Sequence, residues 1–472
     1  MVTVSKHLTF APAVSLFMAL ALGGCAASLG KDYIAGQQKE WLQKAYRVDK
    51  NGWIFIHIEG GPFERGFQRG YLTADEIDQF LQTLGYVSRF ETARDLEFFV
   101  KAAKRIFKGK VSKEYIKEIS GMVAGMTQAG KDVTFDEMLF MNGFIDIRWY
   151  WWRQEQKAKG PGCSAFIATG DATTDGKIVM AHNSWVGYAL GRFCNIIVDI
   201  LPERGHRILM QSWGPAIYSG TDFFITSAGL VGTETTIGGF TGFDKKGRPV
   251  FERARRAMQY ANNIDEWARI MIKNNNGAYA NSWLVGDVKS GEIARLELGL
   301  KHHSLEKRSD GYITGSNVAE NIEILRDETT ASYDDARVTS VARRERWKQL
   351  MRDHYGKIDV EIAKKMLADH YDAYLAKENP SQRTICGHGE LDDGSVPQSR
   401  WAYYPGGAVD GKAVDSDMAE NWQFWARWGS SCDIGFDAND FLEKQSQYDW
   451  LDRHLKDLPA KPWTVFPLGR KR

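Results

Sequence analysis

The sequence predicts a layered α+β protein, and a change of pattern at Cys163 is the main observation behind that prediction. Before this residue, apolar residues recur at helical spacing through most of 37–158. After it, short runs of alternating apolar residues are separated by turn sequences. Strands grouped between helical segments are typical of a fold in which helices cover the outer faces of the sheets.

The individual elements follow from these two periodicities. Helical spacing is clearest at 64–83, 94–107, 113–129, 135–153, 250–261, 264–273, 334–351 and 359–375. Strand patterns occupy 53–59, 165–168, 177–181, 195–201, 223–226, 230–236, 283–288 and 294–298. Glycine-containing turns at 174–176 and 289–291 separate neighbouring strands. The segment 378–429 is loop-rich, and we find no internal repeat.

Length and charge restrict the function. A chain of 472 residues with 43% hydrophobic content can bury a core in one large domain or two ordinary ones. Because 61 basic residues stand against 60 acidic ones, the chain lacks the positive excess typical of nucleic-acid partners. We therefore expect no nucleic acid and favour a lipid or an acylated small molecule. The 16 tryptophans suit either a wide apolar groove or an ordinary core.

The N-terminus has the pattern of a lipoprotein export signal. Lys6 precedes an apolar run over 8–22, which Pro12 interrupts and which ends in Leu-Gly-Gly-Cys at Cys25. The run is shorter than the roughly 20 apolar residues that a spanning helix needs. We expect Cys25 to carry the lipid. Ala26 after it resembles the sorting signal for the outer membrane of Gram-negative bacteria, so we expect an exported, lipid-anchored protein in an oxidising compartment.

Four further cysteines allow three fully paired connectivities. Cys194 falls on the apolar face of a predicted strand, as expected of a buried and inert thiol. Cys386 and Cys432 lie in glycine-rich loop sequence and are the expected disulfide pair. Cys163 then remains free for chemistry.

A polar linker at 157–162, rich in glycine and proline, ends directly before Cys163. Such a segment is typical of an ordinary interdomain linker and also of a scissile loop. A thiol can attack the preceding carbonyl where the backbone is strained, and Gly162 tolerates strain best. Once freed, the α-amine of Cys163 has an ordinary pKa of about 7.7–8 and can accept the thiol proton. The alternative is a structural cysteine at a strand start.

Three motifs follow one another along the chain: Cys163-Ser-Ala-Phe, Ala181-His-Asn-Ser-Trp185, and Asp222-Phe-Phe-Ile-Thr-Ser-Ala-Gly-Leu230 running into Thr235-Thr236. In order and spacing they resemble the phospholipase B-like proteins, a branch of the N-terminal nucleophile (Ntn) hydrolases. Segments 276–283, 384–391 and 405–412 are similar to later motifs of that family. Segment 61–70 is similar to the prosegment signature of the related isopenicillin N acyltransferase group. Together they cover about 53–435, and the joint pattern is more specific than any single motif.

The resemblance implies an αββα sandwich, the Ntn hydrolase fold, in which two antiparallel sheets stack and the nucleophile opens a central strand. It divides the chain into a signal peptide (1–24), a mostly helical prosegment (25–162) and a catalytic region (163–472). It also implies that the chain cuts itself between Gly162 and Cys163. Cys163 would then hydrolyse an acyl ester or amide without a cofactor.

The resemblance also assigns roles to further residues. His182 and Trp185 match a family element in which a histidine orients the amine or a water. Asn281 matches an asparagine that donates to the oxyanion, a contribution of about 2.7–4 kcal/mol to the barrier. Thr235 and Arg337 match polar residues near the nucleophile. Four of these residues also have a structural alternative. His182 would be a hydrogen-bonded core histidine and Asn281 a strand-edge amide. Thr235 would simply fill a strand, and Arg337 would belong to a solvated helix start. The aspartate that choloylglycine hydrolases place near His182 is missing.

We expect no metal site. Alternate residues of Cys386-x-His388-x-Glu390-x-Asp392 could face one way and bind zinc, but no second ligand cluster flanks them in sequence. A disulfide at Cys386 would also remove its thiolate. We do not expect the adjacent His302-His303 pair to bind a metal either, because the side chains of neighbouring strand residues face opposite ways.

Three functions remain open from the sequence. The first is an acyl hydrolase acting on phospholipids, lysophospholipids or N-acylated amines. The second is an acyltransferase, in which an amine and not water resolves the thioester. The third is a binding lipoprotein that keeps the scaffold without catalysis, since a fold does not dictate function.

Overall fold

The computed structural model describes residues 36–152, 162–220, 222–397 and 401–470. Ala45–Arg472 form one compact unit, and the helix at 36–44 belongs to a separate one. The predicted signal peptide, the lipobox at Cys25 and the linker up to residue 161 lie outside the described residues.

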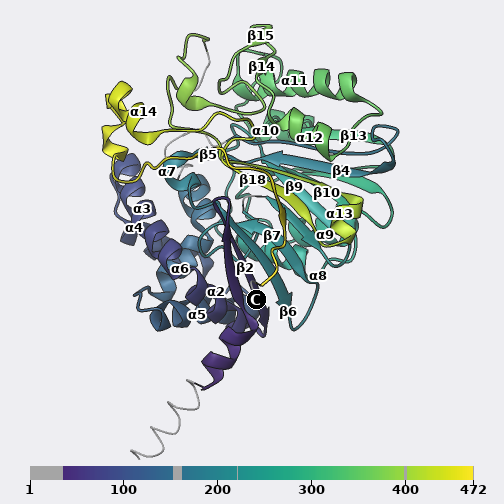
Figure 1. Cartoon of the computed structure of the whole chain (residues 1–472). Coiled ribbons are helices and arrows are strands. Elements are labelled where there is room, and N and C mark those ends of the chain that lie inside the picture. The colour runs from purple at the N-terminus through teal and green to yellow at the C-terminus, as the bar shows by residue number, and fades with distance from the viewer. Residues whose placement is uncertain (1–35, 153–161, 221, 398–400, 471–472) are drawn as a thin grey trace, which may run out of the picture. The chain divides into compact units, whose positions relative to one another are not determined.

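Two sheets form the centre of the large unit (Figure 1). The nine-stranded sheet runs in the order β1 (Tyr46–Lys50), β2 (Trp53–Gly60), β6 (Ile196–Pro202), β7 (Ile208–Ser212), β8 (Phe223–Thr226), β9 (Leu230–Thr236), β10 (Asn281–Asp287), β11 (Glu292–Leu298) and β12 (His303–Arg308). The six-stranded sheet runs in the order β13 (Gly311–Gly315), β3 (Ser164–Gly170), β4 (Gly176–Asn183), β17 (Asp410–Asp415), β18 (Phe424–Trp428) and β19 (Thr464–Phe466). Neighbouring strands are antiparallel except β2 and β6, which are parallel.

Helices flank these sheets and build the N-terminal part. Before the linker they are α2 (Pro62–Leu72), α3 (Ala74–Thr92), α4 (Leu96–Phe107), α5 (Lys113–Gln128), α6 (Phe135–Asn142) and a π-helix at Ile145–Trp151. After it they are α7 (Tyr188–Gly191), α8 (Val250–Tyr260), α9 (Ile264–Ile272), α10 (Ile322–Glu328), α11 (Thr339–His354), α12 (Val360–Leu367), α13 (Ser416–Glu420) and α14 (Ala438–Lys444). Most match the predicted segments. α11, however, begins five residues after the predicted start at 334, because 334–338 form turns.

Alternation along the strands produces the layers. On β3, Ala165 and Ile167 belong to the core between the sheets, whereas Phe166 belongs to a second core under α11 and α12. A Cβ built at Gly286 on β10 would lie 2.9 Å from Ile167, so the two sheets are in direct contact. On the far face of the nine-stranded sheet, Trp267 of α9 packs against a tryptophan of β10. The predicted αββα order is thereby confirmed (Figure 1).

The segment before the linker is mostly helical but is built into the same unit. Its strands β1 and β2 extend the nine-stranded sheet, and β2 pairs with β6 from beyond the linker. Helices α2 and α5 cross at backbone contact: a Cβ at Gly66 or Gly70 would lie 1.9 or 2.1 Å from a carbonyl oxygen of α5. Only glycine permits so close an approach, which explains the glycines of the 61–70 motif.

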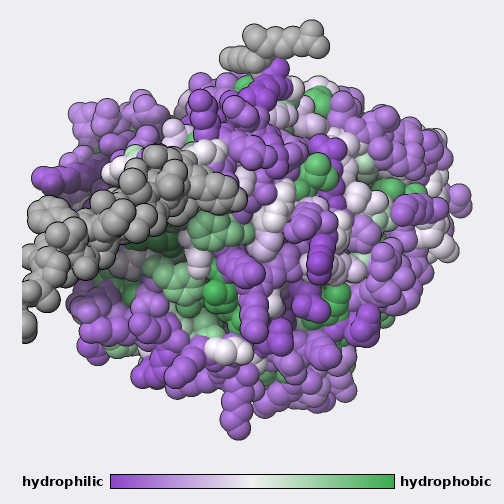
Figure 2. Space-filling model, turned by 90° about the horizontal axis from the view of Figure 1, so that it is seen from below, coloured by the Kyte–Doolittle hydropathy of each residue, from purple (hydrophilic) through white to green (hydrophobic). Residues whose placement is uncertain are grey.

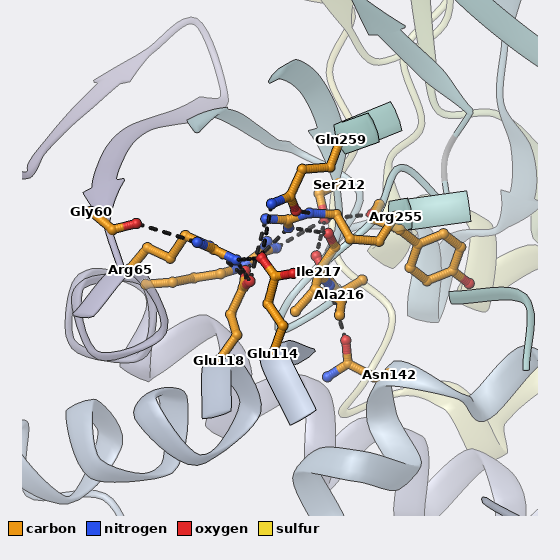
Figure 3. Close-up of polar contacts among 12 residues, drawn as sticks. Gly60, Arg65, Glu114, Glu118, Asn142, Ser212, Ala216, Ile217, Arg255 and Gln259 are labelled. Atoms are coloured by element: carbon orange, nitrogen blue, oxygen red, sulfur yellow. Dashed lines mark hydrogen bonds and ion pairs between the residues drawn. The ribbon is translucent and has the colours of Figure 1, made fainter. Parts of the chain in front are cut away.

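A buried ion network joins this segment to the region after the linker (Figure 3). Glu118 on α5 lies between Arg65 of α2, at 2.8 Å, and Arg255 of α8, at 3.1 Å. Arg255 also donates to the carbonyl oxygen of Ile217 at 2.6 Å. All three charged side chains are at most 1% exposed. Burying these charges is favourable only while each keeps its partners, so the network fixes the two segments to each other.

Among the described residues, no helix combines the length and the apolar character that crossing a bilayer requires. Figure 2 shows a face that is mostly hydrophilic, with hydrophobic residues gathered left of the centre of the view. Most of that face is therefore suited to contact with water.

The ion network predicts a specific sensitivity. Glu118→Ala should lower the free energy of unfolding by about 3–5 kcal/mol, because two arginines would remain buried without their carboxylate. Glu97→Ala is the matched control, since Glu97 forms an exposed pair with Lys101 and its loss should change stability little. Denaturant unfolding of the three proteins measures both effects. Equal stability of the two variants would contradict the role given to the network.

Candidate active site

Cys163 lies directly before β3, an interior strand that pairs with β13 and β4. Its side chain is 6% exposed. Burial raises the pKa of the thiol well above its usual value, the charges of Glu234 and Asp222 raise it further, and the backbone N–H of Trp185 acts in the opposite direction. The thiol is therefore neutral and needs a base before it can act as a nucleophile.

His182 is placed beside the thiol by strand pairing. It lies opposite Ala165 on β3 and Lys412 on β17, so the three side chains share a face. Donor atoms of His182, Cys163 and Glu234 lie within 4.8 Å of one another. Burial lowers the pKa of His182 well below its usual value, and the Lys412 ammonium lowers it further. The backbone of Glu234 approaches the neutral ring, but neither ring nitrogen makes a hydrogen bond of good geometry to a described residue.

Trp185 contributes through its backbone and its side chain. Its N–H is directed to the thiol. β5 (Trp185–Gly187) pairs with β16 (Gly406–Ala408), which holds the backbone in place. The indole packs so closely on Gly387 that a Cβ there would lie 2.3 Å from Nε1. A fixed N–H beside a nucleophile is the kind of donor that stabilises an oxyanion.

A buried lysine network supports the same region. Lys412 donates from Nζ to Asp410 at 2.6 Å, to Gln211 at 2.6 Å and to Ser184 at 2.7 Å. Both Lys412 and Asp410 are fully buried. The sequence motif contained these two residues, but we gave them no role. Their spacing of two on a strand, which puts both side chains on one face, was the available signal.

Two carboxylic acids, Asp222 and Glu234, lie next to the Cys163 thiol, and neither was assigned a role from the sequence. The Tyr279 hydroxyl is 2.5 Å from Asp222 Oδ2 and 3.1 Å from Glu234 Oε1 and donates to this pair. Burial raises the pKa of Asp222 to about 6, and burial together with the charge of Asp222 raises that of Glu234 well above its usual value. The pair therefore holds a proton near neutral pH.

Asn281 and Thr235 both lie near the nucleophile region. Asn281 opens β10 opposite Thr236, which lines the same cavity as Cys163. It is fully buried, and neither atom of its amide has a partner among the described residues. An unused buried amide needs an explanation, and an oxyanion supplies one. Thr235 packs against Gly315 of β13, and its catalytic role stays a prediction.

Arg337 does not lie at the nucleophile. It is paired with Asp335 in the turn before α11, and its side chain is 42% exposed. The arginine that contacts the Cys163 segment is Arg343, which lies six residues later, in the second turn of α11. Arg343 is buried and donates to the carbonyl oxygen of Cys163 and, at 3.1 Å, to Ser164 Oγ. It therefore occupies the place that we expected for Arg337.

The residue before the nucleophile is confined. A Cβ built at Gly162 would lie 3.0 Å from both Arg343 Nη2 and Asn317 Oδ1. These two side chains are fixed, because Arg343 donates to Asn317 at 2.8 Å and Asn317 donates to the carbonyl of Thr236 at 2.7 Å. Glycine is the residue that fits without displacing them.

Two adjoining cavities lead from Cys163 outward. The inner one, of about 40 Å³, is lined by Cys163, Asp222 and Tyr279. The outer one, of about 420 Å³, has a largely aromatic wall. The residues that line both are Phe144, Trp149, Trp185, Val186 and Leu190. Because these five residues line both cavities, the two adjoin; we call them together the aromatic channel, which has the Cys163 thiol at its inner end and whose outer volume suits a small-molecule ligand.

The expected disulfide is absent. Cys386 and Cys432 are free thiols, as are Cys163 and Cys194. His388 lies against both thiols, with Nε2 at 3.5 Å from Cys386 Sγ and 3.3 Å from Cys432 Sγ. The prediction for Cys194 is confirmed, since it is free and buried.

Residues 47–322 match the sequence model of the family named phospholipase B. The chain belongs to the phospholipase B family. The resemblance carried by the motifs around Cys163 is thereby confirmed. Cys163, His182, Trp185, Asp222, Glu234 and Asn281 all lie within the matched segment.

Relatives within and outside this family vary in how far they match. An uncharacterized protein of Archaeoglobus fulgidus is 26% identical over 369 residues, which cover 70% of this chain and 60% of that protein. A phospholipase B of Crotalus adamanteus is 28% identical over 295 residues, covering 55% and 50%. The chain thus spans about half of the length of these relatives or slightly more. A conjugated bile acid hydrolase from Clostridium perfringens is 9% identical, with 56% and 89% covered and a TM-score of 0.34.

The acid pair predicts how stability depends on pH. Both pKa values are raised in the folded state, so that state binds more protons than the unfolded chain, and stability falls as pH rises from about 4 through 6 and above. Glu234→Gln removes one of the two titrating carboxyl groups of the acid pair. In a Cys163→Ala background, we expect this variant to lose less stability than its parent between pH 5 and 8, by roughly 1–3 kcal/mol. Parallel curves of melting temperature against pH would contradict the shared proton.

Proposed function

We propose that this chain is a cysteine acyl hydrolase, activated by cleavage between Gly162 and Cys163, that acts on an acyl ester or amide of a lipid. The observation that carries the proposal is the position of the thiol: it lies at the inner end of the aromatic channel, beside the N–H of Trp185. Family membership and the free state of Cys163 support it.

Maturation would begin with the thiol of Cys163 attacking the carbonyl carbon of Gly162. The S–C bond forms, the C–N bond breaks, and the thiol proton ends on the released nitrogen. Water then hydrolyses the thioester. Arg343, which binds the carbonyl of Cys163, holds the backbone next to the scissile bond. The neutral ring of His182 can carry the proton between sulfur and nitrogen.

In the mature enzyme, the freed α-amine would take the thiol proton, because its ordinary pKa of about 7.7–8 suits a base near neutral pH. The pair Asp222 and Glu234 would then take the place of the missing aspartate of related enzymes, because a Glu234 oxygen lies within 4.8 Å of the Cys163 sulfur and the Tyr279 hydroxyl joins the two acids. The oxyanion of the tetrahedral intermediate would accept from the Trp185 N–H and the Asn281 amide.

The substrate class follows from the aromatic channel. Its outer part presents Phe90, Trp149, Trp152, Trp401 and Trp450 around a volume of about 420 Å³. Each methylene that leaves water for such a wall contributes about 0.8 kcal/mol. A long acyl chain is therefore bound more favourably than a short one, with its carbonyl next to Cys163.

The protein would act at the cell envelope, anchored through a lipid on Cys25. Cys25→Ala should release it from membranes, because the N-terminal apolar run is too short to anchor the chain stably. Membrane fractionation with labelled palmitate checks this outcome. An unlabelled parent protein that stays membrane-bound would replace the lipoprotein proposal with a signal anchor.

Cleavage is tested by substituting the nucleophile. Purified parent protein should contain a fragment whose first residue is Cys163, and the two fragments should elute together because Glu118 joins them. Cys163→Ala should stay intact and inactive, whereas Cys163→Ser should be cut slowly, since a hydroxyl is a weaker nucleophile. Cys194→Ala, at the second buried cysteine of the inner cavity, is the control for cleavage and should be cut as the parent is. N-terminal sequencing decides the matter, and a cleaved, active Cys163→Ala protein would overturn the proposal.

Asn281→Ala tests the oxyanion donor separately. If its amide stabilises the transition state, kcat should fall about 10²–10³-fold with substrate binding little changed. Thr235→Val, at the neighbouring position, should have a smaller effect because that side chain faces β13. Kinetics with a panel of acyl esters, together with melting temperatures, separate the two roles. A loss of melting temperature at near-normal kcat would show that Asn281 is structural.

A further inference from the structure

We propose that His370, Cys386, His388 and Cys432 form a zinc site that fastens the loops of the C-terminal region to the wall of the aromatic channel. One donor atom from each residue lies within 4.8 Å of all the others. Two thiols and two imidazoles are a common ligand set of structural zinc sites. The inference does not depend on Cys163 being a nucleophile, and it departs from the expectation that the chain holds no metal.

The distances within the cluster fit one tetrahedral ion. With zinc–sulfur and zinc–nitrogen bonds of about 2.3 and 2.05 Å, a tetrahedral angle places N and S about 3.6 Å apart. His388 Nε2 lies 3.5 Å from Cys386 Sγ and 3.3 Å from Cys432 Sγ. The rings of His370 and His388 are 5.1 Å apart and inclined by 67°, so they approach the cluster from different sides. Little movement of the side chains would be needed to bind the ion.

The surroundings are those of a metal site. His388 is 1% exposed, and its Nδ1 is 2.8 Å from Glu390 Oε1, which leaves Nε2 for the cluster. Tyr188 donates to the other oxygen of Glu390 at 2.7 Å. A carboxylate behind a ligating histidine is the usual second layer of zinc sites. In addition, the backbone N–H of Ile434 points to Cys432 Sγ at 3.4 Å, as expected for a thiolate ligand.

One ligand candidate has an unused donor atom. His370 Nε2 is buried and has no hydrogen-bond partner among the described residues. A buried ring nitrogen without a partner is unfavourable unless something else binds it. The sequence missed this residue, because His370 precedes β14 (Tyr371–Asp372), far from the Cys386–His388 motif. That distance in sequence is why we found no second ligand near the motif.

The cluster lies directly behind the channel wall. Gly387, between two of the ligands, is the residue on which the Trp185 indole packs. Its carbonyl accepts from the N–H of Ala408 at 2.8 Å, and His388 bridges to Gly407. Both of those residues belong to β16, the partner strand of β5. A bound ion would therefore fix the segment that holds Trp185 in the channel.

Zinc and a disulfide compete for the same thiols. Binding Zn²⁺ releases two protons from the cluster and involves no redox change. A Cys386–Cys432 disulfide would need an oxidant and would withdraw both sulfurs from the ion. The two outcomes can be separated by mass, since the disulfide lacks two hydrogens.

Metal content of the purified full chain is the test. We expect about one zinc per chain by elemental analysis, and a cobalt-loaded sample should show the visible bands of tetrahedral Co²⁺ together with thiolate charge transfer. The double variant Cys386→Ser with Cys432→Ser should lose the metal and the bands. Cys194→Ser and Cys163→Ala are matched controls and should keep both, which separates this cluster from the one around Cys163. Chelation should lower the melting temperature of the parent and leave the double variant unchanged.

Three results would overturn the proposal. The first is reduced, metal-free protein that takes up neither zinc nor cobalt. The second is undiminished zinc in the double variant. The third is a Cys386–Cys432 disulfide, found by non-reducing mass mapping, in protein prepared with zinc present. Because the cobalt spectrum is recorded on the parent, the test does not rely on the double variant folding.

Discussion

The buried pairing of Glu118 with Arg65 and Arg255 is the interaction on which the rest of the structure depends. A carboxylate between two arginines, all out of water, is stable only if every partner stays in place. The partners come from both sides of the Gly162–Cys163 bond, and β2 pairs with β6 across the same division. Cleavage would therefore free an amine without separating the fragments. The segment before the linker acts as a permanent part of the fold rather than a removable cover.

The requirement that a buried charge keep its partner also applies in the candidate active site. Lys412 is buried only because Asp410 is 2.6 Å away, and Asp222 and Glu234 are buried beside each other because they share a proton. These charges surround a thiol that burial keeps neutral. A neutral thiol is unreactive until a base is present. Under the proposed mechanism, full reactivity would arise only when the Cys163 amine appears, and activation would then depend on cleavage.

The sequence predicted the layers and the strand that follows Cys163 because both depend on local patterns. Period-two alternation located β3, β9 and β10 nearly at their observed positions. It could not locate Arg343, because the turn at 334–338 shifts the helix start and the sequence does not reveal which arginine of the run faces the sheet. Asp222, Glu234 and Tyr279 come from separate strands and loops, so only the folded chain brings them together. The predicted Cys386–Cys432 disulfide is not formed in the structure, and no local pattern could show that His370 and His388 converge on the two thiols from separate segments.

The groups around the thiol and the outer wall of the aromatic channel come from different parts of the chain. The family match ends at residue 322, and it contains the thiol, His182 and both acids. Much of the outer wall of the aromatic channel lies beyond it, at Trp401, Tyr404, Tyr448 and Trp450. Between β15 (Lys377–Glu378) and β16, the described residues form only a short 3-10 helix at Gly389–Leu391, so these loops need fixed points to hold an apolar wall in shape. Gly387 against Trp185 is one such point, and it sits between Cys386 and His388. The chemistry and the selection of the acyl chain would therefore be carried by different parts of the chain that meet at Trp185.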